Sequence, residues 1–309
     1  MITFRFHLVS LVGVFLALGL GVLTGTTVLN RGIVAQLENQ TDRLAADSAG
    51  LREDVEELVA LRDLWAAFGE EAREPLLAGR LGGSRVVVIA QDGTDDESID
   101  GVLAALRAAA ATPDDVVGPI TVTGRLSLRS EGDRAELARI VGGDGSEDAD
   151  LLRARAAGLL ADRLSFGLTG GQVLEELLRA GFLIDEGRHL EEADLRAIGG
   201  PGQVVLALAG GPATSAVPPE GFLIPLVENL AGHDALVAAG EPADGEEEEP
   251  PFVSILRSDG DLASRIATQD NLDQMPGQIG MVVAIEDLLG GVAGHYGVKD
   301  GATRPFPEL

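Results

Sequence analysis

Several residue types that carry chemistry are missing or scarce in this 309-residue sequence. It has no cysteine, which excludes disulfide bonds, thiolate metal sites and thiol nucleophiles. Its only lysine is Lys299, which lies in neither a phosphate-binding loop nor a Schiff-base context. The four histidines, His7, His189, His233 and His295, occur singly, without the spacing of a metal site. No common motif for nucleotide binding, serine hydrolysis or zinc proteolysis is present, so the sequence gives no positive sign of an enzyme or of a bound cofactor.

Positive charge is also scarce. Asp and Glu number 50 against 23 Lys and Arg, which gives a net charge of -27 at pH 7. Such a surface repels phosphate backbones and anionic lipid headgroups, so we expect no nucleic-acid partner. Hydrophobic residues make up 45% of the chain, enough for a folded core.

The first long apolar segment runs from Leu8 to Asn30 without a charged side chain. Roughly 23 residues at ~1.5 Å per residue span about 34 Å, the thickness of a membrane's hydrocarbon core. A cleaved signal peptide is the alternative, but the segment ends in Thr26-Thr27-Val28-Leu29-Asn30 and not in a small-residue cleavage site. The sequence therefore predicts an uncleaved anchor in the cell membrane, over residues 1–31. Arginines flank the span on both sides, so positive charge does not decide its orientation. We infer that the residues after the span are exported, because they form a long acidic segment.

Small residues recur at every fourth position within the span, at Gly13, Ala17, Gly21 and Gly25. A stripe of this kind lets two helix backbones approach closely, and it predicts pairing of two spans. The alternative is the general abundance of Gly and Ala in membrane spans and in this chain.

A heptad pattern follows the span. Apolar residues stand at intervals of seven, at Leu37, Leu44, Leu51, Leu58 and Trp65. If these are d positions of a coiled coil, the a positions include Thr41, Ser48 and Arg62, whose polar side chains weaken the seam. We predict a coiled-coil stalk over residues 32–75 that binds a second copy or an envelope partner, and that ends near Gly69 and Pro75. The alternative is one amphipathic helix packed on the globular part.

The remainder, residues 76–309, has the pattern of an α/β domain. Continuous apolar runs typical of buried parallel strands lie at 84–91, 202–208 and 235–239, with an alternating run at 118–128 and a short strand at 181–185. Helical stretches lie between them, at 99–111, 133–141, 151–164, 171–179 and 225–231, and again at 277–289. The fold class predicted is α/β: a transmembrane helix, a stalk, and a mostly parallel, Rossmann-like extracytoplasmic domain.

One turn in this domain is strongly acidic. Residues 92–97 read Asp-Gly-Thr-Asp-Asp-Glu and follow the first strand, where α/β sheets hold their ligands. Thr94 and Glu97 have the spacing of a capping box, so we interpret the turn as a helix start. Cation binding is the alternative.

The two ends of the chain together resemble one family. The start, Met1-Ile2-Thr3-Phe4-Arg5-Phe6-His7, leads into the span and coil, and the end carries Asp270-Asn271-Leu272-Asp273, Gly277-Gln278-Ile279 and Gly294-His295-Tyr296-Gly297. This combination resembles the actinobacterial MctB-like proteins. The resemblance implies an envelope protein of copper efflux or resistance, described as an outer-membrane channel, with copper as the transported ion. It also implies a link of some members to envelope integrity and division, and it supplies no metal ligands.

The residues and the resemblance lead to different architectures. Continuous apolar strands between helices do not suit an outer-membrane barrel, and one span cannot enclose a pore. We therefore favour a single-pass copper-transport protein that acts as an oligomeric or accessory component. A non-enzymatic envelope or division scaffold is the alternative, and an enzyme is the third. We expect Asp270 and Asp273 to cap the helix at 277–289, and His295 and Tyr296 to pack on the domain without binding copper.

Overall fold

The computed structural model describes residues 3–186, 190–210, 215–243 and 251–308, without the side chains of residues 3, 5, 26–39 and 192. The chain divides into two units, Met1–Ala66 and Ala67–Leu309. The domain boundaries predicted above stay predictions. His189 lies outside the described residues.

A long helix, α1, runs from Thr3 to Leu77. It contains the segment Phe6–Gly25, which is long and apolar enough to cross a membrane, with a mean hydropathy of 2.3 and none of it buried in the chain's own fold. The helix continues through Gly69 and Pro75 and ends at Leu77, so neither residue breaks it, and the predicted end of the stalk at residue 75 stays a prediction.

Gly69 has a packing role that explains its presence inside a helix. A Cβ atom added there would lie 1.7 Å from Sδ of Met275, so only glycine allows this approach. Leu77, at the end of α1, and Leu81 just beyond it are fully buried in the domain core. The last turns of α1 therefore belong to the α/β unit, which offsets the cost of Gly69 and Pro75 in a helix.

The second unit is built on an open sheet. Its described residues form seven strands in the order β3-β2-β1-β4-β5-β6-β7. The strands are β1 Val86–Gln91, β2 Val116–Val122, β3 Leu183–Asp185, β4 Val204–Leu208, β5 Leu236–Gly240, β6 Ile266–Gln269 and β7 His295–Tyr296. All neighbouring pairs are parallel except β2 with β3. The mostly parallel α/β fold is thereby confirmed, with the strand order of dinucleotide-binding folds.

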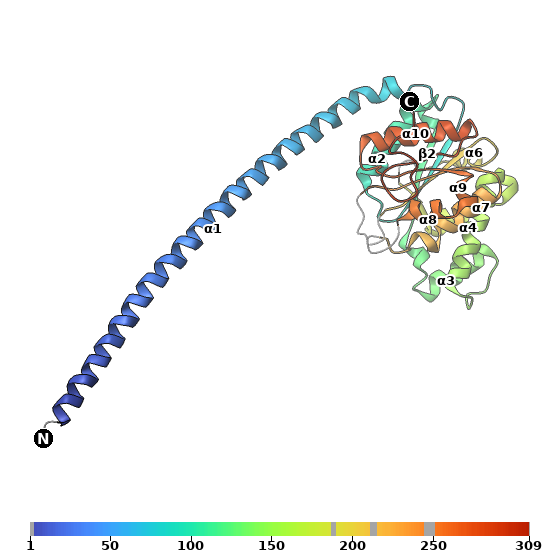
Figure 1. The fold of residues 1–309 in the computed structure, drawn as a ribbon. Coiled ribbons are helices and arrows are strands. Elements are labelled where there is room, and N and C mark those ends of the chain that lie inside the picture. Colours follow the sequence, from blue (N-terminus) through green and yellow to red (C-terminus); the bar gives the residue numbers. More distant parts are fainter. Residues whose placement is uncertain (1–2, 187–189, 211–214, 244–250, 309) are drawn as a thin grey trace. The chain divides into compact units, whose positions relative to one another are not determined.

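Helices cover both faces of this sheet (Figure 1). They are α2 Asp96–Ala109, α3 Glu131–Val141, α4 Ala149–Phe166, α5 Val173–Ala180, α6 Glu192–Ala197, α7 Leu223–Gly232, α8 Phe252–Ser258, α9 Gly260–Ala263 and α10 Met275–Leu289. Short 3-10 turns are η1 Pro113–Asp115, η2 Gly124–Ser127, η3 Gly167–Gly170 and η4 Pro219–Gly221. Helices α2 and α10 pack on one face, and α3, α4, α5, α7 and α8 pack on the other. Side chains of β1 alternate between the two cores, which explains why the strand reads as a continuous apolar run.

Three local expectations differ from the structure. The strand expected over 118–128 is β2, which ends at Val122 and is followed by the turn η2. The short strand β6, with α8 and α9 before it, has no counterpart among the predicted elements. His295 and Tyr296, expected only to pack on the domain, form the strand β7, which hydrogen-bonds to β6 and extends the sheet by one strand.

Candidate functional site

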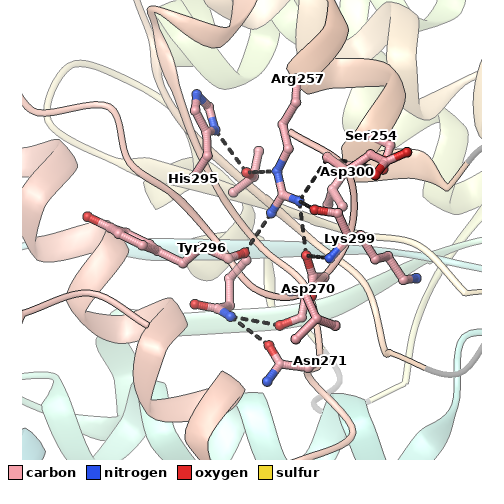
Figure 2. A network of polar contacts seen from close by, with 12 residues as sticks. Ser254, Arg257, Asp270, Asn271, His295, Tyr296, Lys299 and Asp300 are labelled. Atoms are coloured by element: carbon pink, nitrogen blue, oxygen red, sulfur yellow. Dashed lines mark hydrogen bonds and ion pairs between the residues drawn. The ribbon is translucent and has the colours of Figure 1, made fainter. Parts of the chain in front are cut away.

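The carboxyl-terminal motif lies where β5, β6 and β7 end. The chain after β6 lies beside β7 and the chain that follows it, so Asp270 and Asn271 come close to His295 and Tyr296 (Figure 2). Parallel strands end at one edge of a sheet, which is where α/β proteins place their functional groups.

The centre of this region is a buried ion pair between Arg257 of α8 and Asp270. Nη1 of Arg257 lies 2.9 Å from Oδ2 of Asp270, and the two side chains are 1% and 0% exposed. Nε of Arg257 donates to Oγ1 of Thr268 at 2.8 Å, and Nη2 donates to the carbonyl oxygen of Tyr296 at 2.6 Å. Asp270 also accepts from the backbone nitrogen of Val298 at 2.6 Å. Burial lowers the pKa of Arg257, while Asp270 opposes this change.

His295 extends this network through Thr268. Its Nε2 lies 2.9 Å from the carbonyl oxygen of Ala263, which can only accept, so Nε2 carries the hydrogen. Its Nδ1 lies 2.9 Å from Oγ1 of Thr268 and therefore accepts from that hydroxyl. Burial lowers the pKa of His295, with Arg257 acting in the same direction and the bond to Ala263 opposing it. Both ring nitrogens are thus engaged, and this supports the structural role predicted for His295.

The two glycines of the motif allow close packing. Gly297 has φ of +127°, and an added Cβ would lie 2.1 Å from the carboxyl carbon of Asp270. A Cβ on Gly294 would lie 2.4 Å from the hydroxyl oxygen of Tyr296. That hydroxyl donates to Oδ2 of Asp287 at 2.9 Å. Burial raises the pKa of Tyr296 to about 12, and Asp287 adds to the effect.

The other motif residues shape the turn between β6 and α10. Asn271 adopts a left-handed backbone conformation, with φ of +59°, and its Oδ1 accepts from Nε2 of Gln269 at 2.7 Å. Oδ1 of Asp273 accepts from the backbone nitrogen of Ala243 at 2.6 Å. The expectation that Asp270 and Asp273 cap α10 is wrong, because Gln274 occupies the cap position and the two aspartates bind other segments.

A second buried charge pair lies beside the first. Nζ of Lys299 is 3.1 Å from Oε1 of Glu241, whose Oε2 accepts from the backbone nitrogen of Phe252 at 3.0 Å. Lys299 also donates to the carbonyl oxygen of Pro242 at 2.8 Å. Burial raises the pKa of Glu241, with Lys299 opposing it. Neither Arg257 nor Glu241 stands out as a site residue in the sequence, although an arginine directly after the mostly apolar run Phe252–Leu256 is a signal for a buried ion pair.

The acidic turn borders a pocket of about 370 Å³. Its lining residues are Gln91, Asp92, Gly93, Thr94, Asp95, Asp96, Ile99, Thr121 and Glu186. The turn does start helix α2, as expected, but the capping box of Thr94 and Glu97 is wrong because another residue caps the helix. Asp95 is the cap of α2, and its Oδ2 accepts from the backbone nitrogen of Ser98 at 2.8 Å. Thr94 instead donates to the carbonyl oxygen of Gln91 at 2.9 Å.

The predicted packing residues of the amino-terminal unit all lie on α1. A Cβ on Gly13, Gly21 or Gly25 would meet no atom within 4 Å, and Ala17 is exposed on the same helix. The seam residues Leu44, Leu51, Leu58 and Trp65 are 64–69% exposed, while the side chain of Leu37 lies outside the described residues. Pairing of the spans and of the seam therefore stays a prediction.

Copper ligands do not gather in the described part of the chain. Among its residues, no three His, Cys, Asp or Glu side chains come close enough together to hold a metal ion. Copper(I) favours thioether sulfur, and the described residues include two methionines, Met275 and Met281. Met281 is fully buried in the core, and Met275 packs against Gly69.

Comparison with known proteins gives one consistent result. A family model described as "Copper transport outer membrane protein, MctB" matches residues 1–307. The copper transporter MctB of Mycobacterium tuberculosis is 28% identical, and the alignment covers 98% of each chain. The copper transporter MctB of Mycobacterium leprae is also 28% identical, again over 98% of each chain.

Proposed function

Because the chain belongs to the MctB family of copper transport proteins, we propose that it is a single-pass, membrane-anchored component of copper efflux. Its α/β domain lies outside the cytoplasm, and it acts together with further copies or with an envelope partner. Copper is the transported ion and not a resident cofactor.

The observation that carries this proposal is the combination of one apolar segment with a helix-covered sheet. Phe6–Gly25 has the length and hydropathy of a span, and it is the single such segment among the described residues. The sheet is mostly parallel and has helices on both faces, so its strands present no apolar band to lipid. One span encloses no pore by itself, so a path for copper needs several copies or another protein.

This reasoning also favours the cell membrane as the site of anchoring. The family description names an outer-membrane protein. An uncleaved apolar helix of this length is a feature of cell-membrane anchors, whereas outer-membrane proteins cross as closed barrels of alternating strands. We propose cell-membrane anchoring with the domain directed into the envelope.

A second candidate, an envelope or division scaffold, is favoured by the seam on α1. Leu51 and Leu58 are exposed on a helix with a heptad repeat, and the described residues offer no cluster of copper ligands. A scaffold works through the stalk and needs neither a metal site nor an enzyme activity.

A deletion strain separates the two candidates. The copper proposal predicts that deletion raises cell-associated copper and lowers the copper concentration that stops growth, and that the full chain restores both. The scaffold predicts cell-shape and division defects at unchanged cell copper. Unchanged copper content and tolerance in the deletion strain would contradict the copper role.

A further inference from the structure

The pocket beside the acidic turn has no role in the proposed function. Three segments border it: the loop after β1 with the start of α2, Thr121 of β2, and Glu186 directly after β3. It lies near the carboxyl end of β1, an interior strand that pairs with β2 and β4, and doubly wound α/β proteins bind their ligands at this edge of the sheet.

Two side chains that line this pocket have unsatisfied oxygen atoms. Thr121 is 6% exposed and Gln91 is 2% exposed. Oγ1 of Thr121 and Oε1 of Gln91 are buried and have no hydrogen-bond partner among the described residues. The orientation of the Gln91 amide is set by its Nε2, which donates to Ser215 Oγ at 2.9 Å and to the carbonyl oxygen of Val217. Unpaired buried acceptors are costly, so a bound hydrogen-bond donor would be stabilising here.

The negative charge of the pocket excludes the phosphate group of a dinucleotide, the ligand that sheets with this strand order often bind. Dinucleotide-binding sheets hold phosphate at the first helix amino terminus, where a glycine-rich loop leaves room for it. Here Asp92, Asp95, Asp96 and Glu186 line the pocket, and none of its lining residues is basic. These carboxylates repel a phosphate and attract a cation.

A neighbouring hollow at the ends of β4 and β5 is closed. Its lining includes Thr94, Ser98, Leu208, Glu241 and Leu272, and it has no space for a water-sized molecule. Gly210, after β4, lies so near the β1 loop that an added Cβ would be 2.8 Å from the carbonyl oxygen of Gly93. This hollow therefore has no room for a ligand, whereas the open pocket lies on the β2 side of β1.

The geometry favours an organic cation over a metal ion. The carboxylates border a space of about 370 Å³, a size typical of small-molecule sites, and no three of them come close enough together for a metal. A guanidinium group has five N–H donors and an ammonium has three, and neither accepts. Such donors complement both the carboxylates and the two unpaired oxygens.

We propose that this pocket binds an organic cation with a guanidinium or primary ammonium group, either as a free small molecule or as the basic side chain of a peptide. Asp96 and Glu186 supply the attraction, and Thr121 and Gln91 accept hydrogen bonds. This inference goes beyond the copper role and does not depend on it.

Calorimetric titration of the full chain in detergent micelles tests the proposal. The first probe is agmatine, which carries both a guanidinium and an ammonium group, and the second is a blocked Gly-Arg-Gly peptide. Binding of agmatine alone assigns a free ligand, and binding of both assigns a site open to a peptide side chain. Calcium chloride and inorganic phosphate are the comparison ions. We expect binding of agmatine that weakens as salt is added and that calcium at equal concentration does not displace.

Variants then locate the binding. The double change Asp96→Asn with Glu186→Gln should weaken agmatine binding by at least about tenfold, because charge-assisted hydrogen bonds are lost. Thr121→Val should weaken it about threefold or more, without a change in net charge. Glu228→Gln, an exposed carboxylate on α7 that does not line the pocket, is the matched control and should leave the affinity unchanged.

Three results would overturn the proposal. They are no binding of either probe at about 10 mM, equal affinity in the wild type and in Thr121→Val, and displacement by equimolar calcium, which would assign a metal site. Far-UV circular dichroism checks that each variant is folded, and Thr121→Val decides the question if the double variant does not fold.

Discussion

At the scale of single residues, the buried pair of Arg257 and Asp270 should dominate the stability of the domain. Asp270→Asn leaves the guanidinium charge of Arg257 buried without a counterion, so we expect a loss of about 3–5 kcal/mol in the free energy of unfolding. The matched control is Glu308→Gln, which breaks the exposed pair of Glu308 with Arg304 and should leave the free energy of unfolding nearly unchanged. Denaturant unfolding followed by circular dichroism measures both, and equal losses would contradict the assignment.

His295 gives a prediction about pH. Its folded-state pKa lies below the ordinary value of 6.5, so its contribution to stability is present above pH 6.5 and is lost as the pH falls through the lowered value. Protonation of Nδ1 removes the acceptor for the Thr268 hydroxyl. His295→Asn should therefore be less stable than wild type at pH 7.5, by about 1–3 kcal/mol, with a gap that narrows in acid. A gap that stays constant with pH would count against this tautomer.

The same variant tests the structural role of His295 against a copper role. Because both ring nitrogens are hydrogen-bonded to the protein, His295→Asn should leave copper(I) binding unchanged in a calorimetric titration. Stoichiometric binding that disappears with the variant would assign His295 as a ligand.

The limits of sequence reasoning are clearest for these residues. The motif around Asp270 and His295 is visible in the sequence, but its partner Arg257 is not, since the pairing depends on how α8 packs on β6. Asp270 precedes a helix, so the local sequence predicts that its carboxylate caps that helix. In the structure the carboxylate instead pairs with the guanidinium of Arg257, a tertiary contact that local sequence patterns do not predict.

At the scale of elements, the length and composition of each strand determined whether it could be predicted from the sequence. Strand β4 is apolar throughout, and β1 is apolar up to Gln91; both are flanked by turn residues, so they stand out in the sequence. β6 has four residues with two polar side chains, and β7 has two residues, so neither shows a periodicity. Their strand form comes from the sheet, because β6 pairs with β5 and β7 pairs with β6, and each added strand satisfies the backbone groups of the strand before it.

The stalk seam of α1 gives the prediction at this scale. Burying each leucine of a seam contributes about 1.5–3 kcal/mol, so the double change Leu51→Gln with Leu58→Gln should abolish pairing of a seam already weakened by polar a positions. Leu64→Gln is the matched control, since Leu64 is as exposed as Leu58 but stands at a c position, away from the seam.

Because the chain has no native cysteine, pairing of the seam can be measured by disulfide crosslinking through one introduced cysteine. Ser48→Cys places a thiol at an a position of the seam, and a disulfide-linked dimer formed by the full chain would contain that thiol alone. We expect crosslinking in the parent and in Leu64→Gln, and its loss in the double leucine variant. A monomer in all three would reject self-association and direct the search to a partner helix.

At the scale of the whole molecule, the remaining question is the orientation of the chain in the membrane. Arg5 and Arg31 flank the span, so positive charge does not set the direction, whereas the length of the acidic chain after it favours export. Protease added to intact spheroplasts should therefore degrade the α/β unit and leave a small membrane-bound fragment that contains Phe6–Gly25. A cytoplasmic marker protein should survive the same treatment. A domain that resists until the cells are lysed would reverse the topology. A mature amino terminus between Thr26 and Arg31 would replace the anchor with a cleaved signal peptide, and the stalk would then have to reach its partners without a membrane span to hold two copies together.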